Sequence, residues 1–143
     1  MNTTGRLTGV TTIHEMSRDE CLARLQTHQL GRLAVSEGAL PLILPVNYAM
    51  DSANVVFRTR QGGLLDRTCR NTIVAFEIDD FDSSTETGWS VVVVGTATVL
   101  YASEWLRAVE LGLSSAGATD GSLFVKIVPG IITGRAITAD VSA

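Results

Sequence analysis

The sequence has little of what builds a disulfide-stapled, membrane-spanning or nucleic-acid-binding protein. Two cysteines in 143 residues, Cys21 and Cys69, cannot form a disulfide framework. The longest apolar run, residues 91–94, is far shorter than the roughly 20 residues of a membrane helix. Residues 1–10 also lack the basic start and apolar run of a signal peptide. A net charge of −4 disfavours nucleic acid as a partner, because phosphate binding needs surplus positive charge. We therefore expect a cytoplasmic protein with neither membrane nor nucleic acid as its partner.

Clusters typical of catalysis are scarce as well. The two histidines, His14 and His28, have no cysteine or carboxylate at metal-ligand spacing, so no metal site is expected. The acidic run 79–86 lacks the glycine and terminal glutamate of a calcium loop, which predicts a solvated loop. No G-x-S-x-G or C-x-x-C motif occurs. The catalytic residues, if the protein is an enzyme, stay unknown at this level.

What is present is the composition of a folded domain, with 45% hydrophobic and 18% charged residues. Most of the chain after residue 30 is rich in Val, Ile, Thr and aromatics, as strands are. The expected strands are 31–36, 39–49, 54–59, 72–78, 89–101, 123–128 and 132–139, with turns at 37–38, 51–53 and 129–130. Most connections are too short for the crossovers of a parallel sheet. The sequence predicts one mainly β (α+β) domain over residues 1–143, a small barrel of six or seven antiparallel strands.

Short helices are expected beside these strands. Residues 17–20, Ser-Arg-Asp-Glu, fit a capping box at the start of a helix over 17–28, and Gly31 is its expected stop. Periodic apolar residues predict two more helices, at 63–70 and 103–115. Residues 1–12 are polar and lack a period, so they are expected to form a loosely held lead-in.

One segment has the residues of a phosphate site. The strand 54–59 ends in Arg58 and Thr59, and Gly62 and Gly63 then open a helix. A guanidinium binds phosphate oxygens in a bidentate manner, and a hydroxyl adds a further donor. Glycines allow a close backbone approach, and the start of a helix offers unpaired N–H groups. The alternative is that Arg58 is ordinary surface charge.

Two further segments could contact a flat ligand. Asn47 follows Pro45 and Val46 in an otherwise apolar strand, where an amide can both donate to and accept from a heterocycle edge. Pro45 itself lacks an N–H for a sheet, which indicates an edge, a bulge or a ligand-facing stretch. Trp89 begins a long strand, where its indole either stacks on a ligand or closes the core.

The order of five segments resembles that of the pyridoxamine 5′-phosphate oxidase-like, FMN-binding split-barrel family. These segments are 30–34, 45–48, 57–59, 74–79 and 88–91, and the similarity runs over about residues 15–138. The resemblance implies an FMN-binding split β-barrel with a few short flanking helices. It also implies a homodimer, with the cofactor at the interface between the two copies.

The resemblance further implies which residues contact FMN. Arg58 and Thr59 would contact the phosphate, and Gly62 and Gly63 would shape the turn. Val46 and Asn47 would lie beside the isoalloxazine ring, which Trp89 and Ser90 would approach from the long strand. Many relatives have a lysine where this chain has Leu64, and compensation by Arg60 or Arg67 is a hypothesis.

The function implied is that of an FMN-dependent oxidoreductase, which acts on a small-molecule substrate by flavin hydride transfer. A deazaflavin or nicotinamide could serve as the electron partner. One alternative is a non-catalytic protein that binds or carries a flavin or another flat cofactor. A further alternative is a barrel with a decayed site that is used for protein interaction, as Leu64 would suggest.

Overall fold

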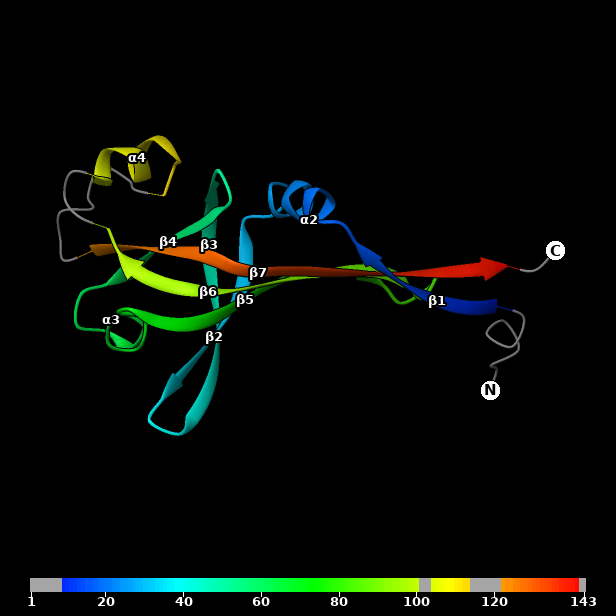
Figure 1. The fold of residues 1–143 in the computed structure, drawn as a ribbon, viewed down its shortest axis with the longest axis horizontal. Helices are drawn as coiled ribbons and strands as arrows, with labels where there is room; N and C mark the ends of the chain where they lie inside the picture. The colour runs from blue at the N-terminus through cyan, green and yellow to red at the C-terminus, as the bar shows by residue number, and fades with distance from the viewer. Residues whose placement is uncertain (1–8, 101–103, 114–121, 142–143) are drawn as a thin grey trace.

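The computed structural model describes residues 9–100, 104–113 and 122–141. Seven strands and three short helices form this part of the chain (Figure 1). In chain order they are β1 (Gly9–Met16), α2 (Arg18–Leu25), β2 (Leu30–Glu37), β3 (Leu40–Asp51), β4 (Asn54–Arg60), α3 (Leu64–Thr68), β5 (Thr72–Asp82), β6 (Thr87–Val99), α4 (Trp105–Glu110) and β7 (Ser122–Val141). Among these described elements, no helix is both long and apolar enough to cross a membrane.

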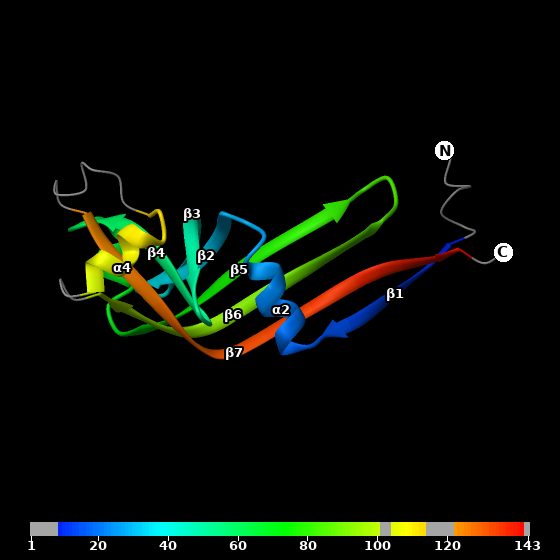
Figure 2. The same cartoon turned by 90° about the horizontal axis from the view of Figure 1, so that it is seen from above.

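The strands form a closed antiparallel ring. Neighbours follow the order β7, β4, β3, β2, β5 and β6, and β6 pairs again with β7. β1 adds to the C-terminal half of β7, so that this pair reaches away from the barrel (Figures 1 and 2). The predicted class, a mainly β split barrel of six or seven antiparallel strands, is confirmed.

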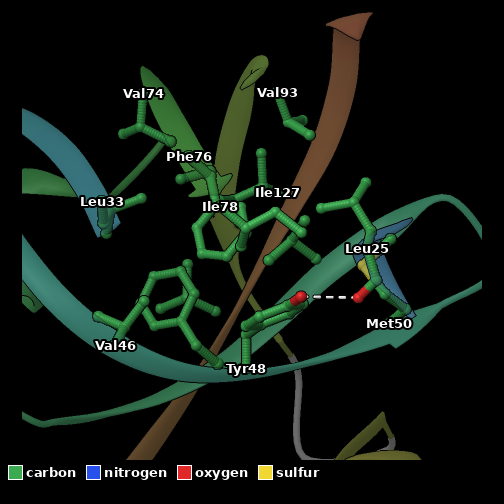
Figure 3. Packing of buried hydrophobic residues seen from close by; sticks show 14 of the residues in the cluster. Leu25, Leu33, Val46, Tyr48, Met50, Val74, Phe76, Ile78, Val93 and Ile127 are labelled. Atoms are coloured by element: carbon green, nitrogen blue, oxygen red, sulfur yellow. Dashed lines mark hydrogen bonds between the residues drawn. The ribbon is translucent and has the colours of Figure 1, made fainter. Parts of the chain in front are cut away.

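Alternating side chains fill the barrel. Val46 and Tyr48 of β3 point inward and meet Phe76 of β5, whose ring lies 4.7 Å from that of Tyr48 (Figure 3). The Tyr48 hydroxyl donates a 2.6 Å hydrogen bond to the carbonyl oxygen of Leu25. Burial raises the pKa of Tyr48 to about 12, so the hydroxyl stays a donor. This bond fixes the end of α2 against β3.

The start of α2 is as predicted. Ser17 Oγ accepts from the N–H of Glu20 at 3.2 Å, and Glu20 Oε1 accepts from the N–H of Ser17 at 3.2 Å. The helix buries Cys21 and Leu25 and packs over β6 and β7 (Figure 2). Cys21 lies so close to β7 that a Cβ at Gly134 would come within 2.5 Å of its sulfur.

Several expected boundaries differ from the structure. The helix ends at Leu25, and Gly31 lies within β2, where a Cβ would overlap the ring of Phe76. Gly31 therefore provides a close approach rather than a helix stop. Residues 9–12, expected in the lead-in, form the first half of β1. The expected turn at 129–130 is a shift of register within the continuous strand β7.

The two other helices are shorter than expected. α3 covers Leu64–Thr68 of the expected 63–70. α4 covers only Trp105–Glu110 of the expected 103–115, and Gly112 with φ +79° follows it. The remainder of that expected helix, apart from 104 and 111–113, lies outside the described residues.

Candidate functional site

An open groove of about 1170 Å³, called the main groove here, is formed by the described residues. It lies where the end of α2, the middle of β3, one residue of β4 and the turn after α4 meet. Its described lining comprises Leu25, Gln26, His28, Gln29, Pro45, Val46, Asn47, Tyr48, Ala49, Met50, Arg58, Leu65, Glu110, Leu111, Gly112 and Leu113. Three of the residues predicted to bind the cofactor, Val46, Asn47 and Arg58, are therefore brought together.

The pairing of β3 with β4 explains why they meet. Tyr48 and Phe57 are cross-strand partners, and both side chains are buried in the barrel. Because side chains alternate along a strand, Asn47 and Arg58 point to the outer side. These two residues directly adjoin the pair Tyr48–Phe57 on their own strands, and both line the groove, so an amide and a guanidinium are brought to it.

Arg58 has no carboxylate partner among the described residues. It makes no ion pair of 4 Å or less within the part of the chain that the structure describes. Other arginines are neutralised by carboxylates, since Arg67 lies 2.7 Å from Glu37 and Arg107 lies 3.1 Å from Asp51. Arg58 is thus available for an anionic group in the main groove.

The neighbouring predicted phosphate contact points elsewhere. Thr59 is half-buried, pairs with Leu123 of β7 and is not among the described lining residues. Arg58 and Thr59 therefore face opposite sides of β4, as the alternation along the strand predicts.

The glycine turn after β4 is closed by internal hydrogen bonds. Gly62, with φ +77°, donates its N–H to Oδ2 of Asp66 at 2.7 Å. Gly63 donates its N–H to the carbonyl oxygen of Arg60 at 3.1 Å. Neither of these two N–H groups is free for a phosphate. Both glycines shape the turn, and the role of Gly62 and Gly63 in cofactor binding stays a prediction.

Leu64 is the first residue of α3 and is half-buried. The next residue, Leu65, lines the main groove. Arg67 is held by Glu37, so it is not free to replace a lysine. Arg60 is exposed and pairs with Ser122 in the ladder, and its compensation for the missing lysine stays a hypothesis.

Trp89 and Ser90 do not line the main groove in the described residues. The indole of Trp89 lies edge-on to the ring of His28 at 5.2 Å, and the Arg24 guanidinium lies 4.9 Å from its centre. Ser90 pairs with Asp79 and Arg135 within the sheet. Trp89 therefore reaches the groove only through His28.

Sequence reasoning missed the residues that α2 and α4 contribute. His28 lines the groove, and its Nδ1 lies 2.8 Å from Thr27 Oγ1. Glu110 from the end of α4 brings a carboxylate to the same groove. The proximity of His28 to the segment 30–34 of the family resemblance was the one available signal, whereas nothing local marked Glu110.

Comparisons with known proteins place this geometry in a family. The sequence profile described as pyridoxamine 5′-phosphate oxidase matches residues 17–136. The chain belongs to the pyridoxamine 5′-phosphate oxidase family. The match runs from the N-cap of α2 into the last part of β7, so the predicted resemblance is confirmed and only β1 lies wholly outside it.

Individual proteins are similar to this chain over most of their length. A FAD binding protein from Mycobacterium smegmatis is 32% identical with a TM-score of 0.78, over 87% of this chain and 98% of that one. A conserved Corynebacterium diphtheriae protein of unknown function is 36% identical with a TM-score of 0.71, over 87% and 97% of the two chains. An uncharacterized Mycobacterium tuberculosis protein is 35% identical over 131 residues, 88% of this chain and 86% of its own.

Proposed function

We propose that this protein binds a flavin nucleotide, FMN or FAD, in the main groove. The observation that carries the proposal is that Arg58, which has no ion-pair partner among the described residues, lines this groove together with Asn47. Arg58 would hold a phosphate, and Val46 and Asn47 would lie beside the isoalloxazine ring. The FAD-binding relative from M. smegmatis, 32% identical to this chain, supports the same ligand class.

The proposed activity is oxidoreduction of a small molecule, with a deazaflavin or nicotinamide as electron partner. A bound flavin supplies the hydride chemistry. The residues of this chain would orient the ring, bind the phosphate and exclude water from one side of the ring. Six other predicted residues remain proposed contributors to flavin binding, chiefly because they shape the strand ends around the groove: Thr59, Gly62, Gly63, Leu64, Trp89 and Ser90.

The test begins with the purified protein. Bound flavin gives an absorbance band near ~450 nm, and mass spectrometry of the released ligand distinguishes FMN from FAD. Titration of the ligand-free protein with each nucleotide, followed by flavin fluorescence, gives the two affinities. A colourless protein that leaves the fluorescence of both nucleotides unchanged would overturn the proposal.

A second candidate is flavin binding without turnover, as a carrier. It is favoured by the M. smegmatis relative, which is named as a binding protein. Anaerobic mixing of the loaded protein with NADH separates the two candidates. Bleaching of the flavin band by NADH, followed by repeated NADH oxidation once oxygen is admitted as the acceptor, supports the oxidoreductase. A flavin band that NADH leaves unchanged supports the carrier.

We also propose a homodimer, supported by apolar side chains on the outside of the barrel. Ile73 of β5 and Ile131 of β7 are 74% and 60% exposed, and Val128 is exposed beside them. The register places Ile73, Thr96 and Val128 in one row and Val94 with Ile131 in the next. Such a patch is typical of a contact surface. Sedimentation of the wild type and of Ile131→Asp tests it, because a dimer at this surface becomes monomeric in the variant.

A further inference from the structure

A smaller groove of about 620 Å³ opens next to the main groove, and we call it the side groove. The two grooves share His28, Gln29 and Pro45 as lining residues. The side groove is completed by Thr27, Leu30, Gly31, Arg32 and Asp79. A ligand in the side groove would therefore lie directly beside a ligand in the main groove, separated only by the shared wall.

The polar wall of the side groove is a three-group ion cluster. Nη1 of Arg32 donates to Oε1 of Glu77 at 3.1 Å and to Oδ2 of Asp79 at 3.2 Å. In these two bonds Arg32 uses only Nη1 and Asp79 uses only Oδ2, and both side chains are exposed. A hydrogen-bond donor and an acceptor thus stand side by side at the groove.

The charge of this wall differs from that of the main groove. Two carboxylates surround one guanidinium, so no positive charge is left over for an anion. Burial, followed by the neighbouring Asp79, raises the pKa of Glu77 to about 7. Near neutral pH the three groups together therefore carry between zero and one negative charge. Arg58 of the main groove, in contrast, has no such partner within the described chain.

The remaining wall suits a flat ring. Leu30 is 58% exposed and Pro45 is exposed, so both offer apolar surface to a ligand. The imidazole of His28 is held by Thr27 at Nδ1 and by the edge contact with Trp89. These contacts orient one side of the groove before any ligand binds.

We propose that the side groove is a second ligand site for an uncharged planar ring that bears a carboxamide or lactam. The amide oxygen accepts from Arg32 and the amide N–H donates to Asp79. Ring compounds that carry a carboxylate or phosphate instead are rejected, because Glu77 and Asp79 already neutralise the charge of Arg32 and repel a further anion. The role of this ligand as the substrate beside the flavin rests on the proposed function, whereas its binding does not.

Nicotinamide and nicotinate test the proposal, because they share a ring and differ in charge. Saturation-transfer NMR titration of the ligand-free protein at neutral pH gives both affinities. We expect nicotinamide to bind about tenfold tighter than nicotinate, a difference of about 1.4 kcal/mol. Arg32→Gln should abolish nicotinamide binding. Asp79→Asn should reduce the preference, because it removes one of the two carboxylates that repel nicotinate.

Two controls locate the site. Arg107→Gln removes another exposed arginine that is paired with a carboxylate, Asp51, but lines neither groove in the described residues, so nicotinamide binding should not change. Arg58→Ala changes the main groove alone, and nicotinamide should still bind. Thermal unfolding of each variant shows whether Arg32→Gln remains folded, and Asp79→Asn provides an independent test if it does not.

The outcomes separate this site from the flavin site. The proposal that the side groove is a ligand site would be overturned by any of three results. These are equal affinity for both probes, no nicotinamide binding, or an unchanged preference in Asp79→Asn. Loss of nicotinamide binding in Arg58→Ala would place the probe in the main groove and would also overturn it. A protein that binds nicotinamide but neither FMN nor FAD would contradict only the proposed function.

Discussion

Oδ2 of Asp66 accepts a 2.7 Å hydrogen bond from the N–H of Gly62, and Oδ1 lies 2.7 Å from Nη2 of Arg70. Asp66 is buried, and the bond from Gly62, followed by Arg70, lowers the pKa of its carboxyl. This one side chain ties the turn after β4 to α3. The turn follows Arg58 within a few residues, so the carboxylate also fixes the end of the strand that carries the proposed phosphate contact.

Replacing Asp66 with alanine should destabilise the protein. The N–H of Gly62 loses its acceptor and Arg70 loses its ion pair, which costs about 1–3 kcal/mol for a buried group. Denaturant unfolding measures the change in the free energy of unfolding. Asp82→Ala is the control, because Asp82 also accepts from a backbone N–H, that of Ser84 at 2.9 Å, but is exposed. Equal losses in both variants would contradict a specific role for Asp66.

Gly95 should not tolerate a side chain. A Cβ there would overlap the backbone oxygen of Val128 on β7, where the register of β6 and β7 shifts. Backbone cannot move aside as a side-chain tip can, so Gly95→Ala should lower the free energy of unfolding by about 1–3 kcal/mol. Gly130→Ala is the control in the same irregularity, because its Cβ would meet only the Val94 oxygen at 3.4 Å. Equal stability of the two variants would rule out this steric account.

Arg58→Ala should weaken flavin binding without unfolding the protein. Loss of a charge-assisted contact to phosphate costs about 2–3 kcal/mol of binding free energy. Fluorescence titration with FMN and FAD measures the loss, and the melting temperature of the ligand-free variant should change little. Arg60→Ala, two residues along the same side of β4, should keep its affinity because Arg60 does not line the groove in the described residues. A larger loss in Arg60→Ala would assign the phosphate contact to Arg60 instead.

Glu77 should make stability fall as the pH rises toward neutrality. Its pKa is raised from 4.5 to about 7 in the folded protein, first by burial and then by Asp79. Between those values the folded protein holds a proton that the unfolded chain releases, so a higher pH favours unfolding. Glu77→Gln should remove this part of the pH dependence between about 4.5 and 7. Parallel stability curves for wild type and variant over that interval would show that Glu77 titrates normally.

Much of the fold could be predicted because its signals are local. The capping box at 17–20 and the alternation of Arg58, Thr59 and Arg60 at the end of β4 depend on neighbouring residues, and both appear as expected. The turns predicted at 37–38 and 51–53 are also present, and Gly38 and Ser52 adopt positive φ angles there, +61° and +57°. Short-range chemistry fixes such features.

The misplaced features depend on partners far along the chain. Pro129 and Gly130 are typical of a turn, yet β7 continues because β6 pairs on both sides of the irregularity. Gly31 follows a helix in sequence, but a glycine is needed there because any side chain would overlap the ring of Phe76 in β5. No pattern within either segment records these contacts.

The candidate site shows the same division. Asn47 and Arg58 were found because each departs from an apolar strand, and β3 is adjacent to β4 in sequence. The cluster of Arg32, Glu77 and Asp79 joins β2 to β5. This cluster could not be predicted, because the sequence of one strand does not indicate which residues of the other strand lie opposite.

The pairing of Gly9 with Val141 places the two described ends of the chain on neighbouring strands, at the tip remote from α4 (Figure 1). Fusion partners joined directly at Gly9 or Val141 would accordingly start at this tip, away from α4. A short peptide linking the two ends, with new ends opened at the exposed bend around Gly38, should give a circularly permuted protein that keeps every strand pairing.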